Sequence, residues 1–321
     1  MKVLITGIHG FVGSNLVTAL KEQHTLYGLD IVAPEKEGVV KTFSWEDLER
    51  SFADTQDETK VEFDAIIHLA GKAHDTKNKS AAEVYFKVNT GLTQKIFDYF
   101  LASSARKFIF FSTAKAAADR VEGVLTEEVM PSPVGPYGES KIKAEEYILG
   151  KLKSENEKLK DKQVFILRPC MIHGPGNKGN LNLLYSVVRK GIPWPLGAFE
   201  NRRTFTSIEN VCFVVNGLLT KEVSSGIYNM GDDEALSTNE LIEEICKSLG
   251  KKASIWHLPK GVMTGVAKVG GWLHLPLNPD RLQKLTENYV SSNEKIKKAL
   301  GIEKMPVDAR SGLQRTLESF K

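Results

Sequence analysis

The chain has 321 residues, of which 41% are apolar and 26% are charged, proportions that fit a globular protein and exclude a disordered or collagen-like one. Its 43 basic and 40 acidic residues leave a net charge of +3, which gives no argument for a nucleic-acid partner. Met1 leads directly into an apolar run without the pattern of a secretory leader, so we expect a cytoplasmic protein. The three widely spaced cysteines favour neither a disulfide framework nor a zinc site, and we expect no metal.

Short β-type runs alternate with amphipathic helical stretches through the first half of the chain. The strand-like runs cover residues 3–6, 25–32, 65–71, 107–113 and 163–169, and helical patterns cover 89–104 and 137–152. Strands interleaved with helices predict a doubly wound α/β fold around a parallel sheet. After about residue 170 Pro and Gly become frequent. We therefore expect a first domain over 1–170 and a smaller, loop-rich region over 171–321, with some of its strands returning to the first domain.

Three glycines, Gly7, Gly10 and Gly13, follow the first strand-like run and open a predicted helix. Glycines let the backbone approach a pyrophosphate, and the helix N-terminus adds partial positive charge. Asp30 lies at the end of the second run, where an acidic residue can bind the ribose hydroxyls of an adenosine. Its carboxylate would repel a 2′-phosphate, and the following Ile31 supplies no compensating cation. The pattern predicts a dinucleotide site that prefers NAD to NADP.

Tyr137 and Lys141 stand four residues apart at the start of a helix that Pro136 opens. A pair with this spacing shares one helical face, so the ammonium can lie beneath the phenol. An unperturbed tyrosine has a pKa of about 10, and lowering it by roughly three units requires about 4 kcal/mol. The lysine cation and a nicotinamide charge could supply much of that stabilisation. The spacing indicates a tyrosine that exchanges a proton with substrate.

Several motifs occur together and in order: TGxxGFxG at 6–13, an acidic residue after the second strand, DAIIHLAG at 64–71, Asn89, FFST at 110–113 and YxxxK at 137–141. This set resembles the extended short-chain dehydrogenase/reductase family, the NAD-dependent epimerases and dehydratases of nucleotide sugars, over nearly the whole chain. LRPCMIHGPG at 167–176 and NRRTFTSIENV at 201–211 look like the family's substrate-domain segments. The resemblance implies a Rossmann sheet with a smaller C-terminal substrate-binding region, and a homodimer that pairs through helices 89–104 and 137–150.

The resemblance also implies roles for individual residues. Tyr137 would be the general acid/base, Lys141 its electrostatic partner and a ribose ligand, and Thr113 the hydroxyl that binds the sugar oxygen being oxidised or reduced. The expected cofactor contacts are Gly7, Gly10, Phe11, Val12, Gly13, Asp30, Ile31, Leu69, Ala70, Gly71, Asn89, Ser112, Tyr137, Lys141 and Pro169.

The substrate's nucleotide diphosphate has its own expected ligands. Arg203 matches the arginine that grips the diphosphate, and the adjacent Arg202 makes a guanidinium pair suited to bidentate phosphate contact. Asn180 is a second expected contact and Arg281 a third. Asp64 would support the glycine turn from the neighbouring strand rather than touch substrate.

Two segments depart from the family's pattern. Ala114 and Lys115 follow Thr113 where dehydratases carry an Asp-Glu pair, which disfavours 4,6-dehydration. Residues 116–118 are three alanines where the family frequently has Val-Tyr-Gly, and Ala117 stands in place of the tyrosine. Because the aromatic side chain is missing, we expect more room beside the sugar, enough for a 2-acetamido or 6-deoxy substituent.

Two further features leave alternatives open. Cys170 and His173 could form an acid/base pair near the nicotinamide, although a buried thiol and a loop histidine is the favoured interpretation. The apolar stretch 261–277 is the one candidate for membrane contact, but it is too short to span a bilayer and contains Lys268 and several glycines. An apolar lid or a subunit contact is the favoured interpretation there.

Three functions follow from these patterns. The first is an NAD-dependent 4-epimerase of the UDP-glucose or UDP-N-acetylglucosamine type, which oxidises sugar C4 transiently. The close alternative is an NAD(P)H-dependent 4-keto reductase of a UDP-6-deoxy-amino sugar, because LAGKAHD, GPGNKGNL and GIPWPLGAFENRRT look similar to reductases found in polysaccharide biosynthesis. A non-catalytic dinucleotide sensor is disfavoured, because Tyr137, Lys141 and Thr113 are all retained.

Overall fold

The apolar runs of the first half, joined by a strand from later in the chain, form one seven-stranded sheet in which every neighbouring pair is parallel. The computed structural model describes residues 1–32, 34–48, 61–72, 81–155, 159–177, 179–273 and 277–321. From one edge to the other, the strands are β10 (Gly226–Met230), β7 (Gln163–Pro169), β5 (Lys107–Phe111), β4 (Ala65–His68), β1 (Lys2–Thr6), β2 (Thr25–Leu29) and β3 (Lys41–Phe43). The strand order reverses between β1 and β4, as in the doubly wound Rossmann fold, and ligands bind in the crevice at such a reversal.

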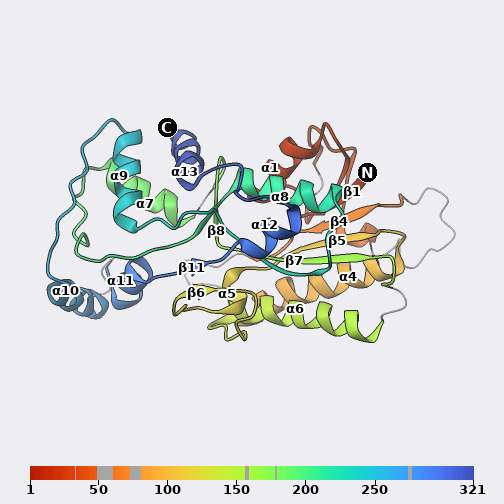
Figure 1. Cartoon of the computed structure of the whole chain (residues 1–321), viewed down its shortest axis with the longest axis horizontal. Helices are drawn as coiled ribbons and strands as arrows, with labels where there is room; N and C mark the ends of the chain where they lie inside the picture. The colour runs from red at the N-terminus through yellow and green to blue at the C-terminus, as the bar shows by residue number, and fades with distance from the viewer. Residues whose placement is uncertain (33, 49–60, 73–80, 156–158, 178, 274–276) are drawn as a thin grey trace.

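Helices cover both faces of this sheet (Figure 1). On one face lie α1 (Phe11–Leu20), α8 (Ile208–Thr220) and α12 (Glu294–Leu300), and their apolar side chains form one core with Val3 and Ile5 of β1. On the other face lie α4 (Leu92–Ala102) and α6 (Pro136–Ser154), which pack on Leu4 and Ile66. Successive strand residues point to opposite faces, so a strand covered on both sides reads as a continuous apolar run.

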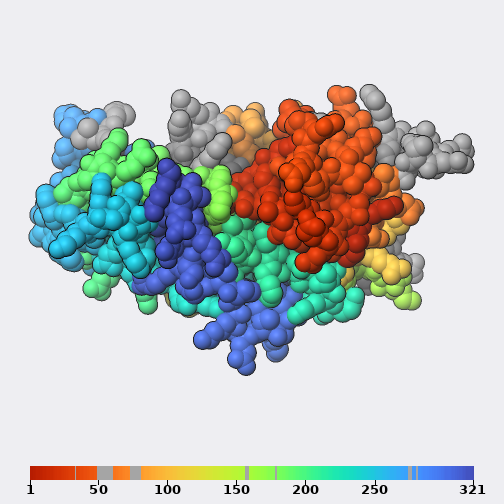
Figure 2. Space-filling model, turned by 90° about the horizontal axis from the view of Figure 1, so that it is seen from above, coloured from red at the N-terminus to blue at the C-terminus, as the bar shows by residue number. Residues whose placement is uncertain are grey.

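The rest of the chain forms a second body beside the carboxyl ends of the strands, at the left of Figure 1. Its core is built by α7 (Asn180–Arg189), α9 (Thr238–Ser248), α10 (Lys260–Trp272), α11 (Pro279–Thr286) and α13 (Ala309–Glu318). Figure 2 shows this body from above, next to the N-terminal part of the chain. Two short strand pairs link it to the sheet: β8 (Met171–His173) with β9 (Phe205–Ser207), and β6 (Val124–Leu125) with β11 (Val290–Ser291).

Element boundaries differ from the expected ones where side chains interrupt the regular pattern. Strand β2 ends at Leu29 rather than at residue 32, because the Asp30 carboxylate bonds the backbone N–H groups of His9 and Ile31. The expected helix 89–104 is preceded by α3 (Ala82–Tyr85) and begins as a π-helical turn, η1 (Phe86–Gly91), before α4. The short helix α5 (Ala114–Ala117) follows β5.

The apolar stretch 261–277 forms most of α10, and its residues 274–276 lie outside the described part of the chain. None of the described helices is both long enough and apolar enough to cross a membrane.

Candidate active site

The glycine turn between β1 and α1 has glycine at the positions where a side chain would not fit. Gly7 has a φ of +68°, a backbone conformation that other residues rarely adopt. A Cβ at Gly13 would lie 2.5 Å from the Gly7 carbonyl oxygen. Helix α1 begins at Phe11 with Gly10 as its N-cap, so no side chain caps its first N–H groups. This open helix N-terminus at the sheet's reversal point fits the pyrophosphate of a dinucleotide.

The surroundings of the turn are held in place by two side chains. Oδ2 of Asp30 accepts a hydrogen bond from the His9 N–H at 3.0 Å, which brings the carboxylate to the glycine turn. The Thr6 hydroxyl accepts hydrogen bonds from the N–H groups of Leu69 and Ala70, at 3.1 and 2.9 Å, and so fixes the loop after β4. Ile31 is 84% exposed beside Asp30. A carboxylate at the end of β2 and an apolar residue beside it fit an adenosine ribose and its base.

Tyr137 and Thr113 come from different elements and meet through a side-chain hydrogen bond. Thr113 caps α5 directly after β5, and Tyr137 is the second residue of α6. The two helices come close at Gly138, where a Cβ would lie 2.7 Å from the Lys115 carbonyl oxygen. The ring of Tyr85 contacts the Tyr137 ring edge-on, with 6.4 Å between the centroids. Gly138 therefore lets α6 approach α5 closely enough for the Tyr137 and Thr113 hydroxyl groups to meet.

Lys141 is buried one helical turn after Tyr137. Its Nζ donates a hydrogen bond to the Phe111 carbonyl at 2.8 Å and lies 4.9 Å from the centroid of the Phe110 ring. Burial lowers the pKa of Lys141 to about 8, although the Glu145 carboxylate opposes that shift. A Cβ at Gly71 would lie 3.2 Å from Nζ, so the loop after β4 reaches the ammonium as well.

The pKa of Tyr137 moves in the opposite direction to the one expected. Burial raises it, the hydrogen bond from Thr113 lowers it by less, and the neighbouring Tyr85 adds to the rise. Burial is the dominant effect on the pKa at both residues, and Lys141 does not reverse it at Tyr137. The positive charge of an oxidised nicotinamide would act in the direction that favours the phenolate.

A buried ion pair beneath Lys141 was not foreseen. The Arg168 guanidinium donates to both Glu145 oxygens, with Nη2 at 2.5 Å from Oε2 and Nε at 3.0 Å from Oε1, and Ser112 donates its hydroxyl to the same carboxylate. Glu145 and Arg168 are at most 1% exposed. Glu145 follows Lys141 by four residues and so lies on the same buried face of the helix. A charged residue on that face was the signal in the sequence that could have predicted a buried ion pair. Ser112, an expected cofactor contact, turns its hydroxyl toward this pair.

Asn89 joins three segments around the site. Its Oδ1 accepts a hydrogen bond from the Lys72 N–H at 2.7 Å, and its Nδ2 donates to the Lys72 carbonyl and to the Ser140 hydroxyl. Asn89 is fully buried in η1. It therefore fixes the loop after β4 against α6, and this loop contains Gly71. Pro169 ends β7, at the same carboxyl edge of the sheet.

The two adjacent arginines do not form the expected guanidinium pair. Residues in an extended segment point to opposite sides, and the backbone at Arg203 bridges to Leu236 on one side and Tyr289 on the other. Arg203 donates to the Lys284 carbonyl of α11 and lies close to Cys170. Arg202 points the other way and pairs with Glu240 at 3.5 Å. Of the two arginines, Arg203 is the one near Cys170, which follows the last residue of β7.

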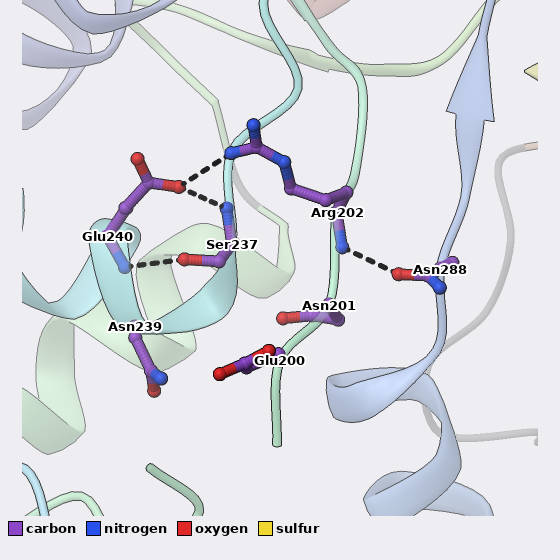
Figure 3. Close-up of a pocket in the computed structure, with 7 residues that line it drawn as sticks. All are labelled: Glu200, Asn201, Arg202, Ser237, Asn239, Glu240 and Asn288. Atoms are coloured by element: carbon purple, nitrogen blue, oxygen red, sulfur yellow. Dashed lines mark hydrogen bonds and ion pairs between the residues drawn. The ribbon is translucent and has the colours of Figure 1, made fainter. Parts of the chain in front are cut away.

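A cavity of about 390 Å³ lies on the Arg202 side (Figure 3). It is lined by Glu200, Asn201, Arg202, Ser237, Asn239, Glu240 and Asn288. Tyr137 and Lys141 do not line it, so we place the candidate active site by its converging side chains rather than by this cavity. The other two expected substrate contacts are exposed: Asn180 begins α7, and Arg281 is on α11, three residues before the carbonyl that binds Arg203.

Asp64 does not support the glycine turn. Its Oδ2 accepts a hydrogen bond from the Lys2 N–H at 2.7 Å, at the start of β1. The glycine turn follows the other end of that strand, because the parallel strands β1 and β4 both run from this edge toward it.

Ala117 does not border a sugar pocket. It is fully buried, in a cluster with Ala114, Leu125 and Tyr289, and the Tyr289 hydroxyl donates to the Ala118 carbonyl at 2.8 Å. An aromatic side chain from far along the chain thus occupies the space that the alanines leave.

Cys170 and His173 do not form a pair. Burial raises the pKa of the Cys170 thiol to about 12, and the nearby Ser291 lowers it by less. Nδ1 of His173 is instead 2.8 Å from the Thr316 hydroxyl, and its Nε2 is 3.7 Å from Asp232. Within the part of the chain that the structure describes, no group of three or more His, Cys, Asp or Glu residues could hold a metal ion.

A glycine turn at the reversal of a doubly wound sheet, facing a Tyr-Lys helix, defines a dinucleotide-dependent enzyme of the Rossmann class. The chain belongs to the NAD dependent epimerase/dehydratase family, whose sequence model matches residues 3–231. NAD is its cofactor, and its class of reaction is that of the NAD-dependent sugar-nucleotide epimerases and dehydratases.

Similar proteins extend this match along the chain. It is 30% identical to a UDP-glucose 4-epimerase of Vibrio cholerae, over 99% of this chain and 95% of that one. It is 27% identical to an N-acetyl-alpha-D-glucosaminyl-diphospho-ditrans,octacis-undecaprenol 4-epimerase of Escherichia coli O157:H7, over 92% and 84% of the two chains. The fold is similar to that of a UDP-glucuronic acid 4-epimerase from Bacillus cereus in complex with NAD, with a TM-score of 0.74 and 21% identity, over 100% of this chain and 96% of that one.

Proposed function

We propose that the protein is a nucleotide-sugar 4-epimerase of the UDP-glucose or UDP-N-acetylglucosamine type. The observation that carries the proposal is the hydrogen bond between Tyr137 and Thr113 with Lys141 one turn further along the same helix. The name of the Vibrio cholerae relative, a UDP-glucose 4-epimerase, supports the same reaction. The homodimer, the cytoplasmic location and a role in polysaccharide biosynthesis stay predictions.

In this reaction the Tyr137 phenolate takes the proton of the sugar 4-hydroxyl, and Thr113 holds the same oxygen by a hydrogen bond. Bound NAD supplies the hydride acceptor and donor at C4. Lys141 has three N–H donors, of which the Phe111 carbonyl uses one, so it can also bind a ribose hydroxyl and stabilise the phenolate. After the keto sugar has turned, Tyr137 returns the proton to the oxygen on the other face.

The nucleotide must stay bound while the sugar turns. Arg203 lies near Cys170, just beyond the end of β7, and is held by the Lys284 carbonyl, so its position for a diphosphate is fixed before substrate binds. Asn180 and Arg281 are the further diphosphate contacts of this proposal. A diphosphate held at Arg203 leaves the bonds between it and the sugar free to rotate.

Proton NMR of UDP-N-acetylglucosamine and UDP-glucose, each incubated with the protein and catalytic NAD, tests the reaction directly. Formation of the C4 epimer to a constant ratio without net NADH is the expected result. If no epimer forms, but NADPH or NADH is consumed with a UDP-4-keto-6-deoxy amino sugar, the protein is the alternative 4-keto reductase.

Tyr137→Phe separates an enzyme from a dinucleotide sensor. We expect kcat to fall by roughly 10²- to 10⁴-fold while NAD binding is retained, because only the exchangeable proton is lost. Tyr147→Phe is the matched control, since Tyr147 is on the same helix but donates its hydroxyl to Asp98 at 2.6 Å. If both variants keep full turnover, Tyr137 is not the acid/base.

A further inference from the structure

Helix α10 has two apolar faces, and only one of them packs on the protein. Met263, Ala267 and Gly270 are buried against the second body, where α10 lies beside α11. A second set of apolar residues has large exposed fractions: Val262 (55%), Val266 (49%), Val269 (54%), Trp272 (80%) and Leu273 (52%). Apart from Trp272, they lie about a quarter turn around the helix from the buried residues.

Four of the exposed residues form one continuous stripe. Val262, Val266, Val269 and Leu273 are spaced by four, three and four residues, which places them along a single side of a helix. Single exposed apolar residues are normal on a protein surface, but a continuous stripe marks a contact surface. Figure 1 shows α10 at the far end of the second body, away from the seven-stranded sheet.

The charges around α10 indicate what contacts the stripe. Between Ile245 and Pro279 the sequence has five lysines and no Asp or Glu, although the whole chain has 40 acidic residues. Lys251, Lys252 and Lys260, before the stripe, are exposed, and so is Lys268 within α10. A surface with this charge attracts an anionic partner.

The partner that combines an apolar interior with an anionic surface is a phospholipid bilayer. A helix lies in the bilayer interface when one face is apolar and lysines flank it, and tryptophan side chains are favoured at that depth. Trp272 and Trp256 are 80% and 53% exposed at the two ends of this segment. The 13 residues of α10 extend for about 20 Å, shorter than the roughly 30 Å of a hydrocarbon core, so the helix would lie flat.

We propose that the exposed face of α10 docks the protein on anionic membranes. The docking orients the site, because α10 packs on α11 and the Lys284 carbonyl of α11 holds Arg203. The diphosphate side of the active site therefore lies on the membrane-facing part of the molecule. The docking does not depend on the sugar or on the reaction proposed above.

Flotation with vesicles tests the docking. We expect the protein to float with vesicles of about 30% phosphatidylglycerol in phosphatidylethanolamine, and to bind phosphatidylcholine vesicles much more weakly. Binding should weaken in about 1 M NaCl, where the Debye length is about 3 Å. In the double variant Val266→Glu/Val269→Glu, partitioning onto vesicles should fall by about tenfold or more, because two carboxylates enter the apolar face. A wild-type protein that stays unbound overturns the proposal.

A matched variant controls for the loss of exposed valines in general. Val40 is 64% exposed in the turn before edge strand β3, and Val40→Glu should float as the wild-type protein does. Equal loss in both variants would contradict the assignment to α10. Light scattering tests whether a second copy of the chain contacts the stripe instead. If Val266→Glu/Val269→Glu turns a dimer into a monomer and the wild-type protein does not bind vesicles, α10 is a subunit interface. The docking proposal is then wrong.

Discussion

The pH dependence of turnover should be controlled by a carboxylate that touches neither cofactor nor substrate. Lys141 has a pKa of about 8, and it must be charged to stabilise the Tyr137 phenolate. Turnover should therefore fall as the pH rises through that value. Glu145 favours the charged lysine. Glu145→Gln removes this support, which lowers the pKa of Lys141 further and moves the alkaline limb of the rate profile to lower pH.

The size of the shift follows from the spacing of the two charges. Side chains four residues apart on a helix are separated by about 6 Å, and at an effective dielectric constant of about 20 their interaction is about 3 kcal/mol. That corresponds to an upper bound of about two pH units. The Arg168 guanidinium is present in the wild type and in the variant, so it does not change this difference. We expect the limb to move by about one to two pH units.

The assay is the initial rate of epimerisation as a function of pH, with saturating NAD. Glu145→Gln also breaks a buried ion pair, which costs about 3–5 kcal/mol of stability, so the folded fraction must be followed by circular dichroism. Arg168→Lys is the matched control: it keeps the positive charge but loses the bidentate geometry, so stability should fall while the limb stays in place. A limb that moves to higher pH in Glu145→Gln, or by equal amounts in both variants, would refute the electrostatic argument.

Two further predictions concern the glycine turn and the thiols. Gly13→Ala places a Cβ 2.5 Å from the Gly7 carbonyl oxygen, so it should lower the free energy of unfolding in urea by about 1–3 kcal/mol and weaken NAD binding. Gly150→Ala on α6 is the control, because no atom lies within 4 Å of its Cβ. It should be neutral or raise the stability by up to about 1 kcal/mol. Equal effects would contradict the steric reading. Burial raises the pKa values of Cys170 and Cys212 to about 12, so at pH 8 a disulfide reagent should titrate the three thiols quickly only after unfolding.

The sheet and the cofactor turn could be predicted because their causes are local. Strands such as residues 107–111 are covered on both faces, so nearly every residue is apolar. Gly10 and Gly13 follow from close approaches to the Gly7 carbonyl, within seven residues of chain. The start of α4 could not be predicted. Its π-helical turn is held by Asn89, whose partners Lys72 and Ser140 are 17 and 51 residues away.

The placement of Tyr137 and Lys141 one turn apart could be predicted from the sequence, whereas arrangements that depend on distant segments could not. Tyr137 and Lys141 share a helix, so their spacing suffices. The space beside Ala117 depends on Tyr289, whose hydroxyl bond to Ala118 spans 171 residues. The divergence of Arg202 and Arg203 depends on backbone bridges of Arg203 to Leu236 and Tyr289, which no local pattern contains.

The return of β10 and α8 to the sheet has a consequence for dividing this protein into pieces. A fragment that stops near residue 170 would leave β7 as an open edge and would uncover the apolar face that Val211, Val214 and Leu218 protect. A fragment that starts there would carry the same helix and strand without the sheet on which they pack. The cofactor-binding and substrate-binding parts must therefore fold as one cooperative unit, and neither can be exchanged between relatives by a single crossover in the gene.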